Sequence, residues 1–203
     1  ASMLAYNLQD LILEPFAGHV FGLTVGESTK LGGMHHGGAL IGMLAVLLGG
    51  TFVARWVAVP IRVWVVGGCL LSGVALFGLA YGGLHADGWP LGLNIFILGL
   101  ANGAFAVAAI GAMMGLAREG GDGREGLRMG LFGAAQAIAF GLGSFAGTAM
   151  VDVMRFVTMG DALAYGAVFA FEGFVFLIAA ALALRLVSPR GQADVRPALM
   201  PGE

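Results

Sequence analysis

Long apolar runs separated by short polar connections dominate the pattern of hydrophobic and polar positions along the chain. A helix needs roughly 20 apolar residues to cross a bilayer, whereas barrel strands are about half as long and alternate in polarity. The pattern therefore predicts an all-α membrane protein with six transmembrane helices. These are expected at residues 3–25, 35–54, 63–83, 91–116, 127–151 and 164–187, as one bundle over 1–187 followed by a cytoplasmic C-terminal tail over 188–203.

The amino-acid composition indicates a membrane protein and argues against several classes of function. Of the 203 residues, 59% are hydrophobic and 11% are charged, and the mean hydropathy is +0.90; soluble domains carry about 25% charged residues. No basic patch suggests a nucleic-acid partner, and the single cysteine, Cys69, excludes a disulfide framework within the chain. The sequence shows no nucleophile triad, phosphate loop or zinc spacing, so we do not expect an enzyme, nor a bound metal.

The placement of basic residues predicts the orientation, because cytoplasmic connections are enriched in Lys and Arg. Eight of ten basic residues fall after the second, fourth and sixth predicted spans, and the other connections hold only Lys30 and Arg155. We therefore expect both ends of the chain to be cytoplasmic. Glycine pairs at a spacing of four indicate close helix contacts: Gly38/Gly42, Gly78/Gly82, Gly99/Gly103, Gly111/Gly115 and Gly143/Gly147.

Two carboxylates lie inside the first predicted span. Asp10 and Glu14 share one helical face, and Pro15 predicts a kink near Glu14. A carboxylate at mid-membrane costs at least about 2.5–3.5 kcal/mol and normally faces a bundle interior or a cavity. We expect these acids to line a cavity, although pairing with arginines or capping of a broken helix would also explain them.

Other polar groups within the spans are few. Asn102, Gln136 and Glu172 are cavity candidates, with hydrogen bonds across helices as the alternative for the amides. His19 is expected in the outer half of the first span, and His35 and His36 are expected to begin the second span from outside. Imidazole can ligate the magnesium of a chlorin, so His35 and His36 are pigment-ligand candidates and His19 is a candidate for the cavity or pigment route, unless these histidines are ordinary interfacial polar residues.

Two stretches carry a family resemblance. "NLQDLILEPFAGHVFGLTVGESTKL" (7–31) and "REGGDGREGLRMGLFGAAQAIAFGLGSFAGTAMVD" (118–152) resemble the PucC-like bacteriochlorophyll-delivery family of the major facilitator superfamily. The resemblance covers nearly the whole chain and matches the C-terminal half of that family. It implies that the six helices are one half of a twelve-helix fold, either a fragment of a longer chain or a separately encoded half, that pairs with an N-terminal six-helix half.

The resemblance also implies a function. The expected role is assembly of photosynthetic light-harvesting complexes in the bacterial inner (intracytoplasmic) membrane, with bacteriochlorophyll as cargo or bound pigment. The expected partners are antenna polypeptides and, beyond them, the reaction centre or pigment-synthesis enzymes. Two alternatives stay open at this point: a proton-coupled transporter of a small solute, in which Asp10 or Glu14 carries the proton, and a structural subunit whose polar residues only pack.

Overall fold

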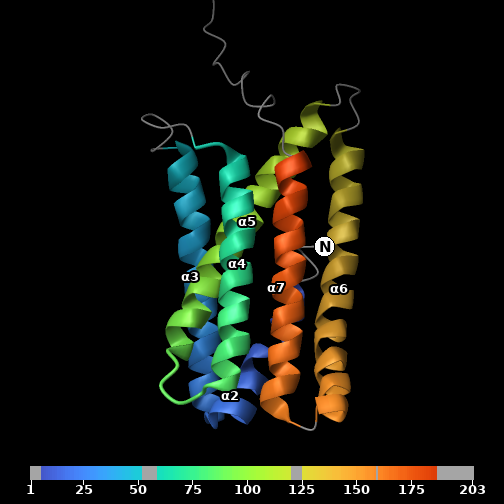
Figure 1. Ribbon diagram of the computed structural model, residues 1–203. Coiled ribbons are helices and arrows are strands. Elements are labelled where there is room, and N and C mark those ends of the chain that lie inside the picture. The colour runs from blue at the N-terminus through green and yellow to red at the C-terminus, as the bar shows by residue number, and fades with distance from the viewer. Residues whose placement is uncertain (1–5, 52–58, 120–124, 159, 187–203) are drawn as a thin grey trace, which may run out of the picture.

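The computed structural model describes residues 6–51, 59–119, 125–158 and 160–186, and all regular structure in these residues is helical (Figure 1). Five helices are long and apolar enough to cross a membrane. They are α3 (Val25–Thr51), α4 (Ile61–Leu84), α5 (Leu91–Glu119), α6 (Glu125–Thr158) and α7 (Asp161–Leu186). The last four predicted spans are thus confirmed. Each observed helix begins within a few residues of the predicted start and ends within seven residues of the predicted end. The predicted tail at 188–203 lies outside the described residues.

The first predicted span is not a continuous transmembrane helix. Residues 6–8 are helical and 9–12 form turns, and the following helix α2 (Leu13–Phe21) has only nine residues. Pro15 has no amide hydrogen for the carbonyl of Leu11, so the helix is interrupted just before it. The expected kink near Glu14 is therefore present as a break a few residues earlier. A sixth helix able to cross the membrane is not found among the described residues.

The broken segment still penetrates the bundle. A methyl group built at Gly147 of α6 would lie 2.4 Å from the carbonyl oxygen of Leu8, and Gly147 is about 16 Å from the end of α6 at a rise of ~1.5 Å per residue. From there the chain runs to the left-handed Gly22, whose φ of 67° ends α2. Irregular backbone at membrane depth is tolerated where protein buries it or where it lines a cavity.

Helix α3 begins ten residues before the predicted second span. Thr24 and Glu27 form a capping box: the Thr24 amide and hydroxyl donate to Glu27 Oε2 at 2.9 and 2.8 Å. Consequently His35 and His36 do not begin this helix, as the sequence pattern predicts; they lie about 15 Å along it, at ~1.5 Å per residue. His19 and His85 do lie near one end of the bundle, where α2 and α4 finish.

Glycine contacts hold the central helices together. A methyl group on Gly38 or Gly42 of α3 would meet the carbonyl oxygens of Phe96 or Leu100 at 2.4 and 2.1 Å, and one on Gly99 of α5 would meet the carbonyl oxygen of His35 at 2.0 Å. These predicted pairs therefore allow direct backbone contact between α3 and α5. The pair Gly111/Gly115 behaves differently, because nothing lies within 4 Å of a methyl group at Gly115.

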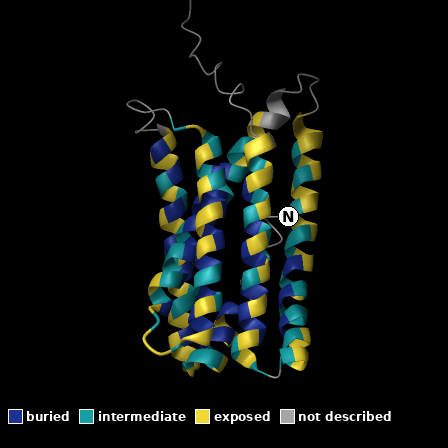
Figure 2. Ribbon diagram, in the orientation of Figure 1, coloured by how far each residue is buried: buried dark blue, intermediate teal, exposed yellow. Residues whose placement is uncertain are grey.

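Helix α6 is the least buried of the long helices. None of the described side chains at 125–142 is buried, and Figure 2 shows this first half of α6 as mostly exposed. Its buried residues, Gly143, Gly147 and Val151, all belong to the second half. The helix is thus attached to the bundle through its C-terminal half.

Candidate functional site

The polar residues of the broken segment and of α3 meet in one pocket. The pocket is lined by residues of the broken segment, of α3 and of α5: Asp10, Leu13, Glu14, Ser28, Leu31, Gly32, His35, His36 and Ile95. Asp10, Glu14 and His36 are exposed in the isolated chain, whereas His35 is 2% exposed. Four of the residues singled out from the sequence are thereby brought together.

Local structure explains why the two acids reach this pocket. The short helix α2 starts after the break, and Glu14 and Pro15 occupy its first turn, where a proline is tolerated. A methyl group at Gly32 would lie 3.2 Å from Glu14 Oε1, so the glycine leaves room for the carboxylate over α3. The break and the glycine together place a negative group beside the histidines of α3.

A buried hydrogen-bond chain leads from the pocket into the bundle. Asn102 Nδ2 lies 3.4 Å from His35 Nε2, and Ser72 Oγ donates to Asn102 Oδ1 at 2.8 Å. Because an amide nitrogen only donates, this contact requires His35 Nε2 to accept. Asn102 and Ser72 are fully buried, so the chain joins α3, α5 and α4 through satisfied polar groups.

The pocket is small. Its volume is about 50 Å³, against roughly 300–1,000 Å³ for typical small-molecule sites, so a chlorin macrocycle does not fit inside it. No group of three or more His, Cys, Asp or Glu side chains that could hold a metal occurs within the described parts of the chain. The arrangement can supply carboxylate acceptors and one exposed imidazole to a molecule that lies against α2 and α3.

The remaining candidates lie elsewhere. Glu172 of α7 is fully buried, and neither of its carboxylate oxygens has a hydrogen-bond partner among the described residues. Gln136 is half-buried on α6 and does not line the pocket. His19 is not in the pocket either; its Nδ1 lies 3.0 Å from the Tyr165 hydroxyl and 2.8 Å from Arg155 Nη2.

Sequence reasoning missed several residues of these sites. Ser28 and Ser72 look like ordinary small residues within or beside apolar runs, and Tyr165 looks like one more aromatic of the last span. Arg155 entered only as an outer basic residue. Its contact with His19 joins positions 136 residues apart, and no local pattern signals such a contact. The start of α3 did have a signal, the T-x-x-E spacing of a capping box at Thr24 and Glu27.

Comparison with known proteins gives one family. The family model described as "PUCC protein" matches residues 1–191. A protein of Rhodobacter capsulatus called "Bacteriochlorophyll synthase 44.5 kDa chain" is 50% identical over 202 residues, which are 100% of this chain and 46% of the relative. "Protein PucC" of Cereibacter sphaeroides is 31% identical over 86% of this chain and 37% of its own. "Protein PucC" of Rhodobacter capsulatus is 32% identical over 92% and 40%.

Two facts limit the conclusions that these matches allow. The chain spans less than half the length of each of these three relatives. No solved structure matches the chain significantly, so the matches identify a sequence family and leave the twelve-helix architecture untested.

Proposed function

Because the chain belongs to the PUCC protein family, we propose that it is part of an assembly factor that handles bacteriochlorophyll for photosynthetic light-harvesting complexes. The family match over residues 1–191 carries this proposal, and the relative whose name contains bacteriochlorophyll, at 50% identity, supports it. The role is assembly and not catalysis: the word synthase belongs to the name of that relative. The same match favours assembly over the proton-coupled transport of a small solute.

Exposed side chains that line the pocket would supply the chemistry for this role to a molecule bound outside it. His36 presents an exposed imidazole near the middle of α3, and a neutral imidazole nitrogen ligates metal ions readily. His35 is less suited, because it is buried and its Nε2 faces Asn102. In this proposal His36 would hold the magnesium of a pigment bound outside the pocket. Asp10 and Glu14 would accept hydrogen bonds from the pigment or from an antenna polypeptide.

The wider setting belongs to the same proposal. Asp10 and Glu14 are exposed in the isolated chain, and so are apolar side chains of α6 such as Leu131 (73% exposed). A second six-helix half, as in a twelve-helix facilitator fold, would shelter such faces from lipid. The setting we propose is the bacterial photosynthetic membrane, with both ends cytoplasmic, and the partners are antenna polypeptides, then the reaction centre or pigment-synthesis enzymes.

Pigment binding is tested by purification in mild detergent. The complete protein should retain bacteriochlorophyll, seen as its absorbance bands and normalised to protein. His36→Leu should remove most of that absorbance, whereas His85→Leu, the matched exposed histidine at the end of α4, should leave it unchanged. A protein that carries no pigment, or equal pigment in both variants, would contradict the assignment of His36.

The carboxylates are tested separately in the photosynthetic cell. Asp10→Asn and Glu14→Gln keep the side-chain shape and remove the negative charge. If the acids act in assembly, the double variant should accumulate normally while light-harvesting complexes decrease several-fold in membrane spectra. If the acids only support the fold, protein abundance should fall in proportion to assembly. Normal abundance with normal assembly would remove Asp10 and Glu14 from the mechanism.

A further inference from the structure

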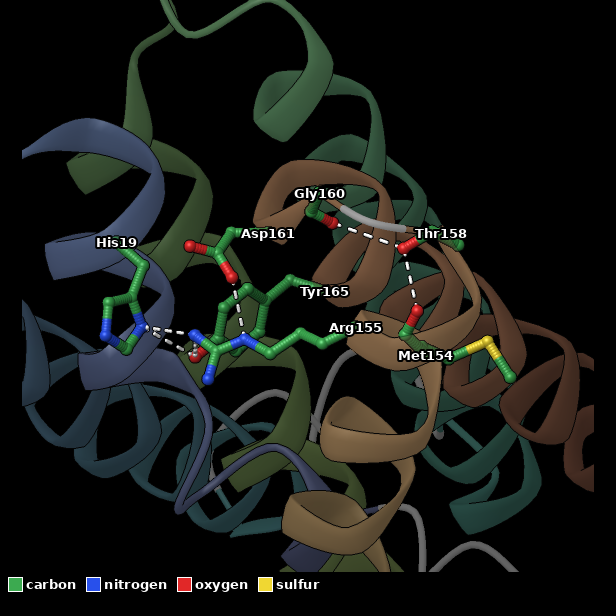
Figure 3. Close-up of polar contacts among 7 residues, drawn as sticks. All are labelled: His19, Met154, Arg155, Thr158, Gly160, Asp161 and Tyr165. Carbon is green, nitrogen blue, oxygen red and sulfur yellow. Dashed lines mark hydrogen bonds and ion pairs between the residues drawn. The ribbon is translucent and has the colours of Figure 1, made fainter.

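A polar cluster at the end of the bundle joins three helices, and the pocket does not include it (Figure 3). Arg155 of α6 points its guanidinium between His19 of α2 and two residues of α7. Its Nη2 lies 2.8 Å from His19 Nδ1 and 3.2 Å from the Tyr165 hydroxyl, and its Nε lies 2.7 Å from Asp161 Oδ1. The guanidinium carbon also lies 5.2 Å from the centre of the Tyr165 ring.

The contact between Arg155 and His19 depends on which ring nitrogen carries the hydrogen. A guanidinium has five N–H donors and no acceptor. The contact between Arg155 Nη2 and His19 Nδ1 is therefore a hydrogen bond only if Nδ1 is unprotonated, with the ring hydrogen on Nε2. A second proton on Nδ1 would place a donor against a donor and a cation against a cation, so the bond from Arg155 requires a neutral ring, whereas the Tyr165 hydroxyl can also accept from a protonated Nδ1.

The charged surroundings of His19 come from two helices. From α6 the groups are Arg155 and Asp152, and Asp152 is close enough to act electrostatically on Tyr165. From α7 they are Asp161 and Tyr165 itself. Arg155 and Asp161 already form an ion pair. The contact that depends on a neutral ring is thus the one between His19 and Arg155.

This contact matters because α2 has few other attachments to α6. Two contacts lie ahead of α2. The carbonyl oxygen of Leu8 approaches Gly147 of α6, and the Ser144 hydroxyl donates to the carbonyl oxygen of Asn7 at 3.5 Å. At its other end, α2 reaches α6 through His19. Phe16 fixes the middle of α2 to α7, with ring centroids 4.9 Å from Phe169. The attachment of the C-terminal end of α2 to α6 therefore depends on His19.

We propose that His19 and Arg155 form a proton-sensitive clasp that holds α2 against the α6–α7 pair and so positions Glu14 over α3. Arg155 is a positioning residue in this scheme, since it reaches the pocket only through α2. The clasp is closed while His19 is neutral, and a proton on the ring opens its contact with α6 while the contact with Tyr165 of α7 can persist. Acidification on the side of the membrane that His19 faces would therefore release α2 from α6. The clasp would regulate the position of Glu14 in the pocket. Only the effect of that movement on pigment handling rests on the proposed function.

Hydrogen–deuterium exchange of the complete protein in lipid nanodiscs tests the clasp without pigment. The readout is the protection factor of amides in α2, corrected for the intrinsic pH dependence of exchange. His19→Asn is the matched variant, because its Oδ1 can accept from Arg155 and cannot take up a proton. His19→Phe removes the acceptor. Peptides from the α3–α5 glycine contact serve as the internal reference.

The expected result has three parts. In the wild type, protection of α2 should fall by about tenfold between pH 8 and pH 5, a factor that corresponds to ~1.4 kcal/mol. His19→Asn should keep its protection over the same range, and His19→Phe should be low at both pH values. Equal losses in the wild type and His19→Asn, or full protection of His19→Phe at pH 8, would overturn the clasp. Because no pigment is involved, failure of the clasp is distinguishable from failure of the pigment assignment.

Discussion

At the scale of single residues, two fully buried polar side chains differ in their surroundings. Asn102 has both amide groups engaged, by Ser72 and by His35, whereas the oxygens of Glu172 have no partner in the described part of the chain. Burying a carboxyl group without a hydrogen-bond partner is costly, so Glu172 is the less favourable of the two within the described helices. The sequence marks both residues as polar groups in apolar runs, and only the fold shows which of them has hydrogen-bond partners.

Replacing each of these residues by leucine should give opposite results. Asn102→Leu leaves the hydroxyl of Ser72 and the ring of His35 without partners and should lower the unfolding free energy by about 1–3 kcal/mol. Glu172→Leu removes two unpaired polar atoms and should be neutral or stabilising by up to about 1 kcal/mol. Thermal unfolding of the detergent-solubilised protein measures both. A large destabilisation by Glu172→Leu would mean that a partner outside the described residues binds this carboxyl.

The sequence singles out candidate site residues where the cost of burying a charge identifies them. Asp10 and Glu14 stand out because carboxylates are expensive in a membrane, and both line the pocket with His35 and His36. The proximity of the two acids to the two histidines could not be predicted, because it depends on where α3 begins. The chain from His35 to Ser72 and the cluster around Arg155 depend on helix packing between distant positions, and single-sequence patterns carry no information on it.

At the scale of elements, the contact between α3 and α5 is determined by individual glycines. Gly37 and Gly38 are neighbours in α3, yet nothing lies within 4 Å of a methyl group at Gly37, while one at Gly38 would lie 2.4 Å from the Phe96 carbonyl oxygen. Gly38→Ala forces two backbones apart and should cost about 1–3 kcal/mol. Gly37→Ala should be neutral or slightly stabilising, because alanine is the better helix former.

The matched pair makes this test specific to packing. Both changes add one methyl group to the same turn of the same helix, so differences in expression or insertion should cancel. Thermal unfolding in detergent should separate the two variants by several degrees. Equal melting temperatures would show that α3 and α5 can slide apart without loss, and that the close approach is not a structural requirement.

Secondary structure was predictable wherever an apolar run was long and uninterrupted. The four spans from Ile61 to Leu186 follow the hydropathy pattern, and their ends lie near the predicted ones. The first span failed for a local reason: Pro15 and the turns at 9–12 divide the apolar run into pieces too short to cross as one helix. The polar "GESTK" stretch looked like a loop, although its capping box makes it the first turns of α3.

At the scale of the whole molecule, the C-terminal ends of the helices separate into two sets. Those of α3, α5 and α7 lie at one end of the bundle in Figure 1, and those of α2, α4 and α6 lie at the other. The basic residues favour the first end, with Arg62, Arg128 and Arg185 on described helices. The orientation itself remains a prediction: the Arg-rich end is cytoplasmic, and the end with His19 and His85 is external.

Cysteine labelling tests this orientation and the early start of α3 together. Cys69 is buried, so single exposed sites can be introduced in a Cys69→Ala background. Gly26→Cys, at the beginning of α3, and Asp87→Cys, in the turn after α4, should react with a membrane-impermeant maleimide on intact spheroplasts. Glu125→Cys, at the beginning of α6, should react only after lysis. All three side chains are exposed, so differences in labelling report the side of the membrane. Labelling of Glu125→Cys alone on intact spheroplasts would reverse the orientation and move the clasp at His19 to the cytoplasmic side.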